Sequence, residues 1–217
     1  MARCGVVLFV YCYYPQIDTN YFSNFHKLFA GKINDRQMTI TKTAFNGLLI
    51  IEPRVFKDDR GYFFESWNKK TFTEAGIPYD FLQDNQSNSD VDVIRGLHFQ
   101  VPPHAQGKLV RVSRGAVLDV VVDLRRNEPT YGKHFKIRLN DRDHRMLFIP
   151  PGFAHGFRTL EENTLFVYKC TDIYAPDTER AIRWNDPDLA IDWETDNPVL
   201  SEKDKNAMLF SDFVSPF

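Results

Sequence analysis

A histidine and two basic residues occur close together between residues 95 and 108 of the chain. His98 follows Arg95 by three residues, and Lys108 comes ten residues after His98. A neutral imidazole can accept a proton near pH 7, and a fixed cation stabilises the negative charge that remains on the carbon acid. This combination favours removal of a proton from a carbon next to a carbonyl group, followed by stabilisation of the enolate.

The pattern around Lys108 predicts that this lysine points into the protein. Lys108 has the same strand parity as Val110 and Val112, which are typical of an inward face. A lysine inside a barrel needs a partner for its charge or a role in function, although a lysine at a strand end can also reach solvent. Tyr168 ends another alternating segment and shares a face with Phe166, where a tyrosine often serves only in packing.

The elements that position these residues are predicted to be mostly strands. Alternating or continuous apolar runs predict strands at residues 48–51, 108–112, 116–124, 135–139 and 165–169, and short helices are expected at 69–75 and after Ser201. The run 116–124 is expected to be half buried. Short strands separated by turn signals indicate an all-β sandwich or barrel rather than a parallel sheet.

Composition limits the class of protein. The 217 residues are 43% hydrophobic, which suffices for a sizeable core, and the formal net charge of −2 gives no reason to expect nucleic-acid binding. No segment approaches the roughly 20 apolar residues of a membrane helix. Cys4, Cys12 and Cys170 cannot all pair, so we expect reduced thiols and a cytoplasmic location. Cys170 lies on an expected strand and is expected to be a small core residue.

Several spaced motifs, which agree in order, resemble the dTDP-4-dehydrorhamnose 3,5-epimerase family of nucleotide-sugar enzymes. They are the stretches 95–100 and 106–108 described above, 150–157, and the pair Tyr168-Lys169. The resemblance begins near Met38, so residues 1–37 are expected to be an N-terminal extension and 38–217 a single domain. The resemblance implies a cupin-type jelly roll, a homodimer and a dTDP-4-keto-6-deoxy sugar as substrate.

No metal or redox cofactor is expected. The pattern Pro150-x-Gly152-x-x-His155 matches the second cupin motif, whereas the first, which normally carries His-x-His, reads His98-Phe99-Gln100. Glutamine is a poor replacement for an imidazole ligand of a transition metal. The chain also shows no glycine-rich fingerprint of a dinucleotide site, and a keto sugar arrives already oxidised.

The resemblance implies a division of roles. His98 would be the base, Lys108 would lie beside the carbonyl oxygen, Tyr168 would be the proton donor, and Asp204 would pair with His98. Ser201 and Asp204 also have the spacing of a helix capping box, so Asp204 has a purely local alternative. Asp186 is a competitor for the pairing role, but its surroundings are typical of a turn.

The expected substrate-binding residues come mainly from the resemblance, and without it residues 83–85 would be interpreted as a loop. They are Arg60, Glu65, Gln83, Asp84, Asn85, Arg95, Lys108, His155, Tyr174, Glu179 and Lys203. The implied reaction is epimerisation at C3 and C5 of dTDP-4-dehydro-6-deoxyglucose. A mono-epimerase, a ketoisomerase and a non-catalytic nucleotide-sugar-binding cupin remain alternatives.

Overall fold

The computed structural model describes residues 38–217, and the expected extension over residues 1–37 lies outside this range. The described chain falls into two compact units. The larger comprises residues 38–54 and 64–217, and the described part of the smaller is the segment Val55–Phe63. That segment contains β3 (Val55–Asp58) and all but the last residue of β4 (Gly61–Phe64), which pair as a hairpin. Residues 38–217 contain no helix with the length and hydropathy that a membrane span requires.

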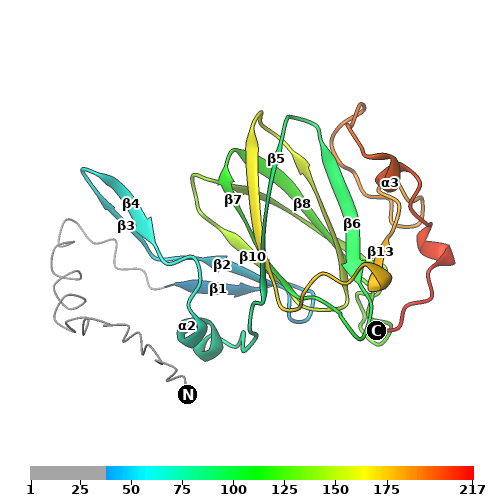
Figure 1. The fold of residues 1–217 in the computed structure, drawn as a ribbon, viewed down its shortest axis with the longest axis horizontal. Coiled ribbons are helices and arrows are strands. Elements are labelled where there is room, and N and C mark those ends of the chain that lie inside the picture. The colour runs from blue at the N-terminus through cyan, green and yellow to red at the C-terminus, as the bar shows by residue number, and fades with distance from the viewer. Residues whose placement is uncertain (1–37) are drawn as a thin grey trace, which may run out of the picture. The chain divides into compact units, whose positions relative to one another are not determined.

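Two antiparallel sheets form the larger unit, which is a cupin-type jelly roll (Figure 1). One sheet has the order β1 (Thr39–Lys42), β2 (Leu49–Glu52), β10 (Met146–Ile149), β7 (Lys108–Arg114), β12 (Thr164–Cys170) and β5 (Gln83–Ser89). The other has the order β13 (Glu179–Ala181), β6 (Ile94–Gln100), β11 (Phe153–Thr159), β8 (Ala116–Asp123) and β9 (His134–Asn140). The all-β prediction is therefore confirmed.

The strands expected from alternating apolar residues are all present. Val110 and Val112 are buried in the core between the sheets, so the inward parity predicted for Lys108 is confirmed. Helix α2 (Lys69–Glu74) begins after Asn68, whose side chain caps Thr71, and its buried Phe72 packs against the outer face of the first sheet. Helix α3 (Glu202–Lys205) follows Ser201, as expected.

Strand β8 differs from its prediction because it is buried along its whole length rather than half buried. Its inward residues, such as Val117 and Val121, contribute to the core between the sheets. Its outward residues, such as Leu118 and Val120, pack under the C-terminal part of the chain, which includes Trp193. The C-terminal segment, orange to red in Figure 1, thus covers the outer face of the five-stranded sheet beside β6 and β13.

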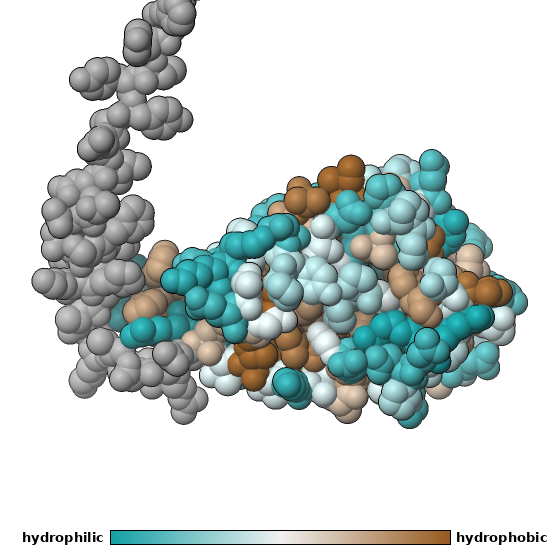
Figure 2. Space-filling model, turned by 90° about the horizontal axis from the view of Figure 1, so that it is seen from below, coloured by the Kyte–Doolittle hydropathy of each residue, from teal (hydrophilic) through white to brown (hydrophobic). Residues whose placement is uncertain are grey.

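The apolar surface on the face shown in Figure 2 occurs in small separate groups among polar side chains. The most exposed large apolar residues among those described include Val214, Leu82 and Val199, which are far apart in the sequence. A single continuous apolar patch would mark a binding surface, whereas scattered apolar residues are ordinary on protein surfaces. We therefore look for function inside the barrel.

Candidate active site

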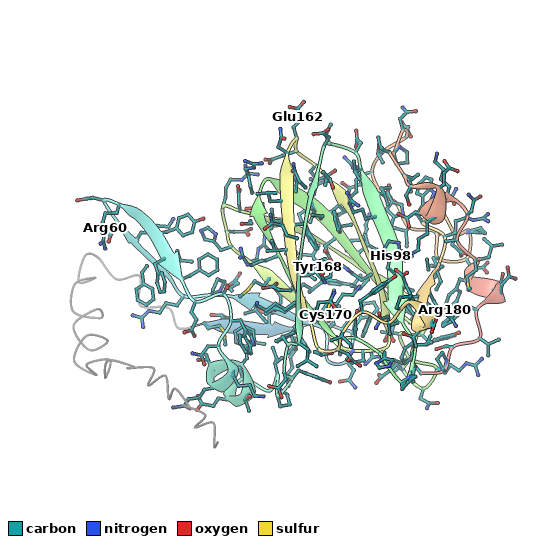
Figure 3. The ribbon with its side chains drawn as sticks, in the orientation of Figure 1. Arg60, His98, Glu162, Tyr168, Cys170 and Arg180 are labelled. Atoms are coloured by element: carbon teal, nitrogen blue, oxygen red, sulfur yellow. The ribbon has the colours of Figure 1, made fainter. Side chains whose placement is uncertain are left out.

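A pocket of about 610 Å³ lies in the larger unit, between the two sheets. All four residues expected to act in catalysis line it, which are His98, Lys108, Tyr168 and Asp204. Figure 3 shows that His98 and Tyr168 come from different sheets, on β6 and β12. Besides Lys108, seven of the expected binding residues also line the pocket, which are Gln83, Asn85, Arg95, His155, Tyr174, Glu179 and Lys203.

His98 forms a short hydrogen bond to a buried carboxylate. Its Nε2 lies 2.5 Å from Oδ1 of Asp204, whose side chain is 4% exposed against 30% for His98. Burial is the largest single influence and would raise the pKa of Asp204, but the hydrogen bond and charge of His98, together with hydrogen bonds from Ser201 and Gly96, lower the pKa below its usual value. With Nε2–H donating to Asp204, the lone pair of Nδ1 is available to accept a proton.

The local alternative for Asp204 holds only in part. The hydroxyl of Ser201 caps α3 by accepting from the backbone N–H of Asp204 at 3.1 Å. The Asp204 side chain does not complete the capping box, because it accepts from His98 instead. Asp186 is a buried turn residue whose Oδ1 and Oδ2 accept backbone N–H groups of residues 188, 189 and 210. The structure thus places Asp204, and not Asp186, beside the histidine.

The strand that carries His98 approaches β11 very closely. A Cβ atom on Gly96 would lie only 2.5 Å from the Cα atom of Gly156, and Gly96 has a φ of +146° that favours glycine. The backbone N–H of Gly96 also contributes to the low pKa of Asp204. Gly96 therefore holds β6 against β11 and supports the carboxylate that pairs with His98.

Lys108 is the cation at the centre of the pocket. Its Nζ donates to the backbone oxygen of His98 at 3.3 Å and lies 5.8 Å from the centre of the Tyr168 ring. Burial lowers the pKa of Lys108, although the negative charges of Asp119 and Glu179 act in the opposite direction. A partly desolvated ammonium at this position can stabilise an oxyanion strongly.

Tyr168 contributes a protonated hydroxyl from the opposite sheet. It pairs with Asn85 on β5 and with Val110 on β7. Burial raises the pKa of Tyr168, while the charge of Arg95 acts to lower it. The phenol is therefore protonated at neutral pH and can act as a proton donor.

A second histidine–carboxylate pair lies beside the first. His155 on β11 is opposite His98 on β6, and its Nε2–H donates to Oδ2 of Asp119 at 3.0 Å. Burial lowers the pKa of His155, with Asp119 acting against this change. Asp119 was not among the residues predicted from the sequence, although it carries one signal: it is an acidic residue at an inward position within the apolar run of β8.

Residues 83–85 belong to a strand, so their interpretation as a loop is wrong. β5 has the sequence QDNQSNS and pairs with β12 over its whole length. An entirely polar strand lacks the apolar alternation by which strands are identified. Its alternation appears instead in the directions of the side chains, because Gln83 and Asn85 line the pocket whereas Asp84 pairs with Lys169 at 2.8 Å.

Hydrogen bonds and ion pairs join several polar side chains at the wall of the pocket. The Tyr174 hydroxyl donates to Glu179 at 2.9 Å, and Lys203 pairs with the same carboxylate at 2.6 Å. Arg95 donates from Nε to the hydroxyl of Ser89 at 3.1 Å. Burial would raise the pKa of Glu179, but its bonds from Lys203 and Tyr174 lower it. The pocket thus contains cations and amides suited to a charged, polar ligand.

Three expected binding residues are not among those that line this pocket. Asp84 lies on the other face of its strand. Glu65 accepts a hydrogen bond from the side chain of Asn68 at 3.0 Å. Arg60 belongs to the hairpin unit, where its guanidinium pairs with Asp58 at 2.6 Å. Their binding roles remain predictions.

Comparisons with known proteins all find epimerases that act on dTDP-linked deoxy sugars. The family model described as dTDP-4-dehydrorhamnose 3,5-epimerase matches residues 42–212. A dTDP-4-dehydrorhamnose 3,5-epimerase from Pseudomonas aeruginosa is 52% identical over 177 residues, which cover 81% of this chain and 97% of the relative. A dTDP-4-dehydrorhamnose 3-epimerase from Streptomyces niveus is 39% identical over 176 residues, which cover 81% of this chain and 85% of the relative.

A solved structure extends the comparison to three dimensions. The crystal structure of a dTDP-6-deoxy-D-glucose-3,5-epimerase from Legionella pneumophila, in complex with dTDP-4-keto-L-rhamnose, has a TM-score of 0.77 and 46% identity to this chain. The similarity covers 81% of this chain and 94% of the Legionella chain. The sequence, the jelly roll and the pocket therefore lead to one conclusion: this chain belongs to the dTDP-4-dehydrorhamnose 3,5-epimerase family.

Proposed function

We propose that this protein is an isomerase that epimerises dTDP-4-dehydro-6-deoxyglucose at C3 and C5, giving dTDP-4-dehydrorhamnose. One observation carries the proposal for the site. A histidine with a carboxylate partner and a protonated tyrosine line one pocket from two facing sheets. Inversion at a carbon requires a base on one face and an acid on the other, whereas a binding protein has no need of either.

The proposed reaction follows from the positions of these side chains in the pocket. His98 takes the proton from carbon on its Nδ1, and Asp204 stabilises the imidazolium that results. Lys108, with Arg95 nearby, stabilises the enolate oxygen at C4. Tyr168 then delivers a proton to the opposite face of the carbon. Because the C4 keto group acidifies both neighbouring C–H bonds, one base serves C3 and C5 after the ring changes its conformation.

A mono-epimerase on the same substrate class is the second candidate. The 39% identity to a 3-epimerase keeps it in consideration, and the higher identity to 3,5-epimerases favours reaction at both carbons. The deciding experiment incubates the protein with dTDP-4-dehydro-6-deoxyglucose and follows the product configuration by NMR. Inversion at C3 and C5 is the expected outcome. Inversion at C3 alone would identify the mono-epimerase, and binding without inversion would identify a binding protein.

Activity is expected to fall on the alkaline side at a pH below the ordinary pKa of lysine. Burial lowers the pKa of Lys108, so its ammonium loses a proton, and the enolate loses its cation, as the pH rises through that lowered value. Tyr168 titrates at higher pH, because burial raises its pKa. The measurement is kcat/KM against pH. Lys108→Arg keeps a charge that does not titrate, so the same alkaline limb in that variant would contradict the assignment.

Full activity is expected after exhaustive treatment with a chelator such as EDTA. Nε2 of His98 donates to Asp204, and the amide of Gln100, at the second position of the first cupin motif, bonds only to backbone groups. The Gln100 amide is therefore already engaged, and only Nδ1 of His98 remains as a nitrogen ligand from this motif, which is too little to hold a transition metal. The check is turnover before and after chelation, together with elemental analysis. Loss of activity that a stoichiometric metal restores would overturn the expectation.

We further infer that the enzyme acts as a cytoplasmic homodimer. The exposed aromatic side chains of the hairpin, Tyr62 and Phe63, support an association between copies. Cys170, a buried free thiol, fits a reducing compartment. Sedimentation of the purified protein gives the oligomeric state, and a monomer at micromolar concentration would contradict the dimer.

A further inference from the structure

Three glutamine side chains hold four successive residues of the chain at the edge of the pocket. The segment Asp172–Ala175 connects β12 to the turn before β13 (Figure 1). Gln106 Nε2 donates to the backbone oxygen of Asp172 at 2.7 Å. Gln83 Oε1 accepts from the backbone N–H of Tyr174 at 2.6 Å. Gln100 bonds to the residues on either side of Tyr174. Four consecutive residues of a loop are thus fixed by side chains rather than by a strand.

Gln100 is the central member of this group. Its side chain is buried, and its amide makes three hydrogen bonds: Nε2 donates to the oxygens of Ile173 at 3.2 Å and of His104 at 2.7 Å, and Oε1 accepts from Ala175 N–H at 2.8 Å. Only a side chain with both a donor and an acceptor of this length can make this set. An apolar replacement would leave three part-buried backbone groups without their side-chain partners, which loosens the segment.

The segment matters because of the side chain that it presents. Tyr174 lines the pocket and is 51% exposed, so much of its surface is accessible to a ligand there. Its hydroxyl bonds to Glu179, which is also paired with Lys203. An exposed ring on a fixed backbone offers a stacking surface for a nucleobase, and its contribution to affinity depends on how firmly it is held.

We propose that Gln100 and Gln106 are positioning residues for the nucleotide part of the substrate. They hold Asp172–Ala175 so that Tyr174 and, through it, Glu179 are placed before the ligand arrives. Gln100 stands at the second position of the first cupin motif, where a metal-binding relative has histidine. In this chain that position fixes a binding loop. The inference rests on the proposed function, because it assumes a nucleotide ligand.

The test is a double-mutant cycle read out by binding of dTDP, measured by calorimetry. Gln100→Met is expected to raise the Kd for dTDP about tenfold, since a ring that is seldom in place loses most of its stacking contribution. Gln106→Met removes the one hydrogen bond to the oxygen of Asp172 and is expected to raise the Kd for dTDP about threefold. Tyr174→Ala should raise Kd about tenfold in the wild-type background and about twofold or less beside Gln100→Met. Asn88→Met, an exposed amide on β5 outside the pocket lining, is the matched control.

The kinetic readout separates positioning from general weakening. In Gln100→Met the KM for the sugar nucleotide should rise with Kd, while kcat stays within about threefold of wild type, because His98, Lys108 and Tyr168 are unchanged. Additive effects of Gln100→Met and Tyr174→Ala, or a fall in kcat with unchanged KM, would overturn the proposal. If Gln100→Met does not fold, the cycle of Gln106→Met with Tyr174→Ala decides by the same criterion.

The outcome also distinguishes this inference from the proposed function. Wild-type protein that binds dTDP and converts the keto sugar, but gives an additive cycle, refutes only the positioning role. Wild-type protein that binds dTDP without converting the sugar refutes the epimerase proposal and leaves the cycle informative. Wild-type protein that does not bind dTDP refutes both.

Discussion

His98→Ala protein is expected neither to epimerise dTDP-4-dehydro-6-deoxyglucose nor to exchange its C3 and C5 protons with heavy water. Both His98 and His155 have a carboxylate partner at Nε2, but His98 is 30% exposed in the pocket whereas His155 is 6% exposed and burial lowers its pKa, which makes it the weaker base. Loss of a positioned base costs about 10²–10⁴-fold in rate. Both processes should fall together, since both begin with the same proton transfer.

NMR in heavy water measures the two processes at once, through deuterium at C3 and C5 and the configuration of the product. His134→Ala is a matched control, because His134 is a half-buried histidine on β9 outside the pocket lining. It should keep wild-type exchange and turnover. Thermal unfolding of both variants checks the fold. Continued exchange at both carbons in His98→Ala would show that another group is the base.

Tyr168→Phe should separate the two processes that His98→Ala abolishes together. His98 still forms the enolate and can return a solvent-exchanged proton to the face from which it came, so deuterium exchange persists. Delivery of a proton to the opposite face is lost, and epimerisation should fall about 10²–10⁴-fold. The phenol is a suitable donor because burial raises its pKa and keeps it protonated at neutral pH.

The same NMR experiment provides the measurement, with Tyr131→Phe as the matched control. Tyr131 packs its ring against Phe210 and does not line the pocket, so removal of its hydroxyl should leave both processes unchanged. Epimerisation of Tyr168→Phe at the wild-type rate would make Tyr168 a packing residue. The acid would then have to be sought elsewhere in the pocket.

Much of the barrel was predictable because its strands carry an apolar alternation of their own. Lys108 is the clearest case: its parity with Val110 and Val112 predicted an inward lysine, and the lysine lies inward. The burial of β8 on both faces was not predictable in the same way. It depends on the C-terminal segment, whose residues such as Trp193 cover the outward side chains of β8, and this long-range contact leaves no local pattern in the sequence.

Site residues could be predicted where the residue type or a motif suggests a chemical role. They could not be predicted where the role depends on a partner that is distant in the sequence. His98 was a candidate from its residue type and neighbours, Tyr168 became one only through the family resemblance, and both line the pocket. Asp119 could not be linked to His155, because the two residues meet only when β8 pairs with β11. β5 was missed as a strand because its polar side chains face a pocket and solvent, and neither environment selects apolar residues.

The position of Asp204 has a consequence for the synthesis and folding of the chain. His98, the proposed base, lies on β6, but its carboxylate partner lies on α3, within the C-terminal segment that packs over the outer face of the sheet. A nascent chain that has emerged only as far as β13 already contains every strand of both sheets, yet its histidine has no carboxylate to support it. The carboxylate that pairs with His98 is therefore supplied only after every strand of both sheets has been synthesised. A chain that ended before α3 would lack both this carboxylate and part of the segment that covers the outer face of the five-stranded sheet.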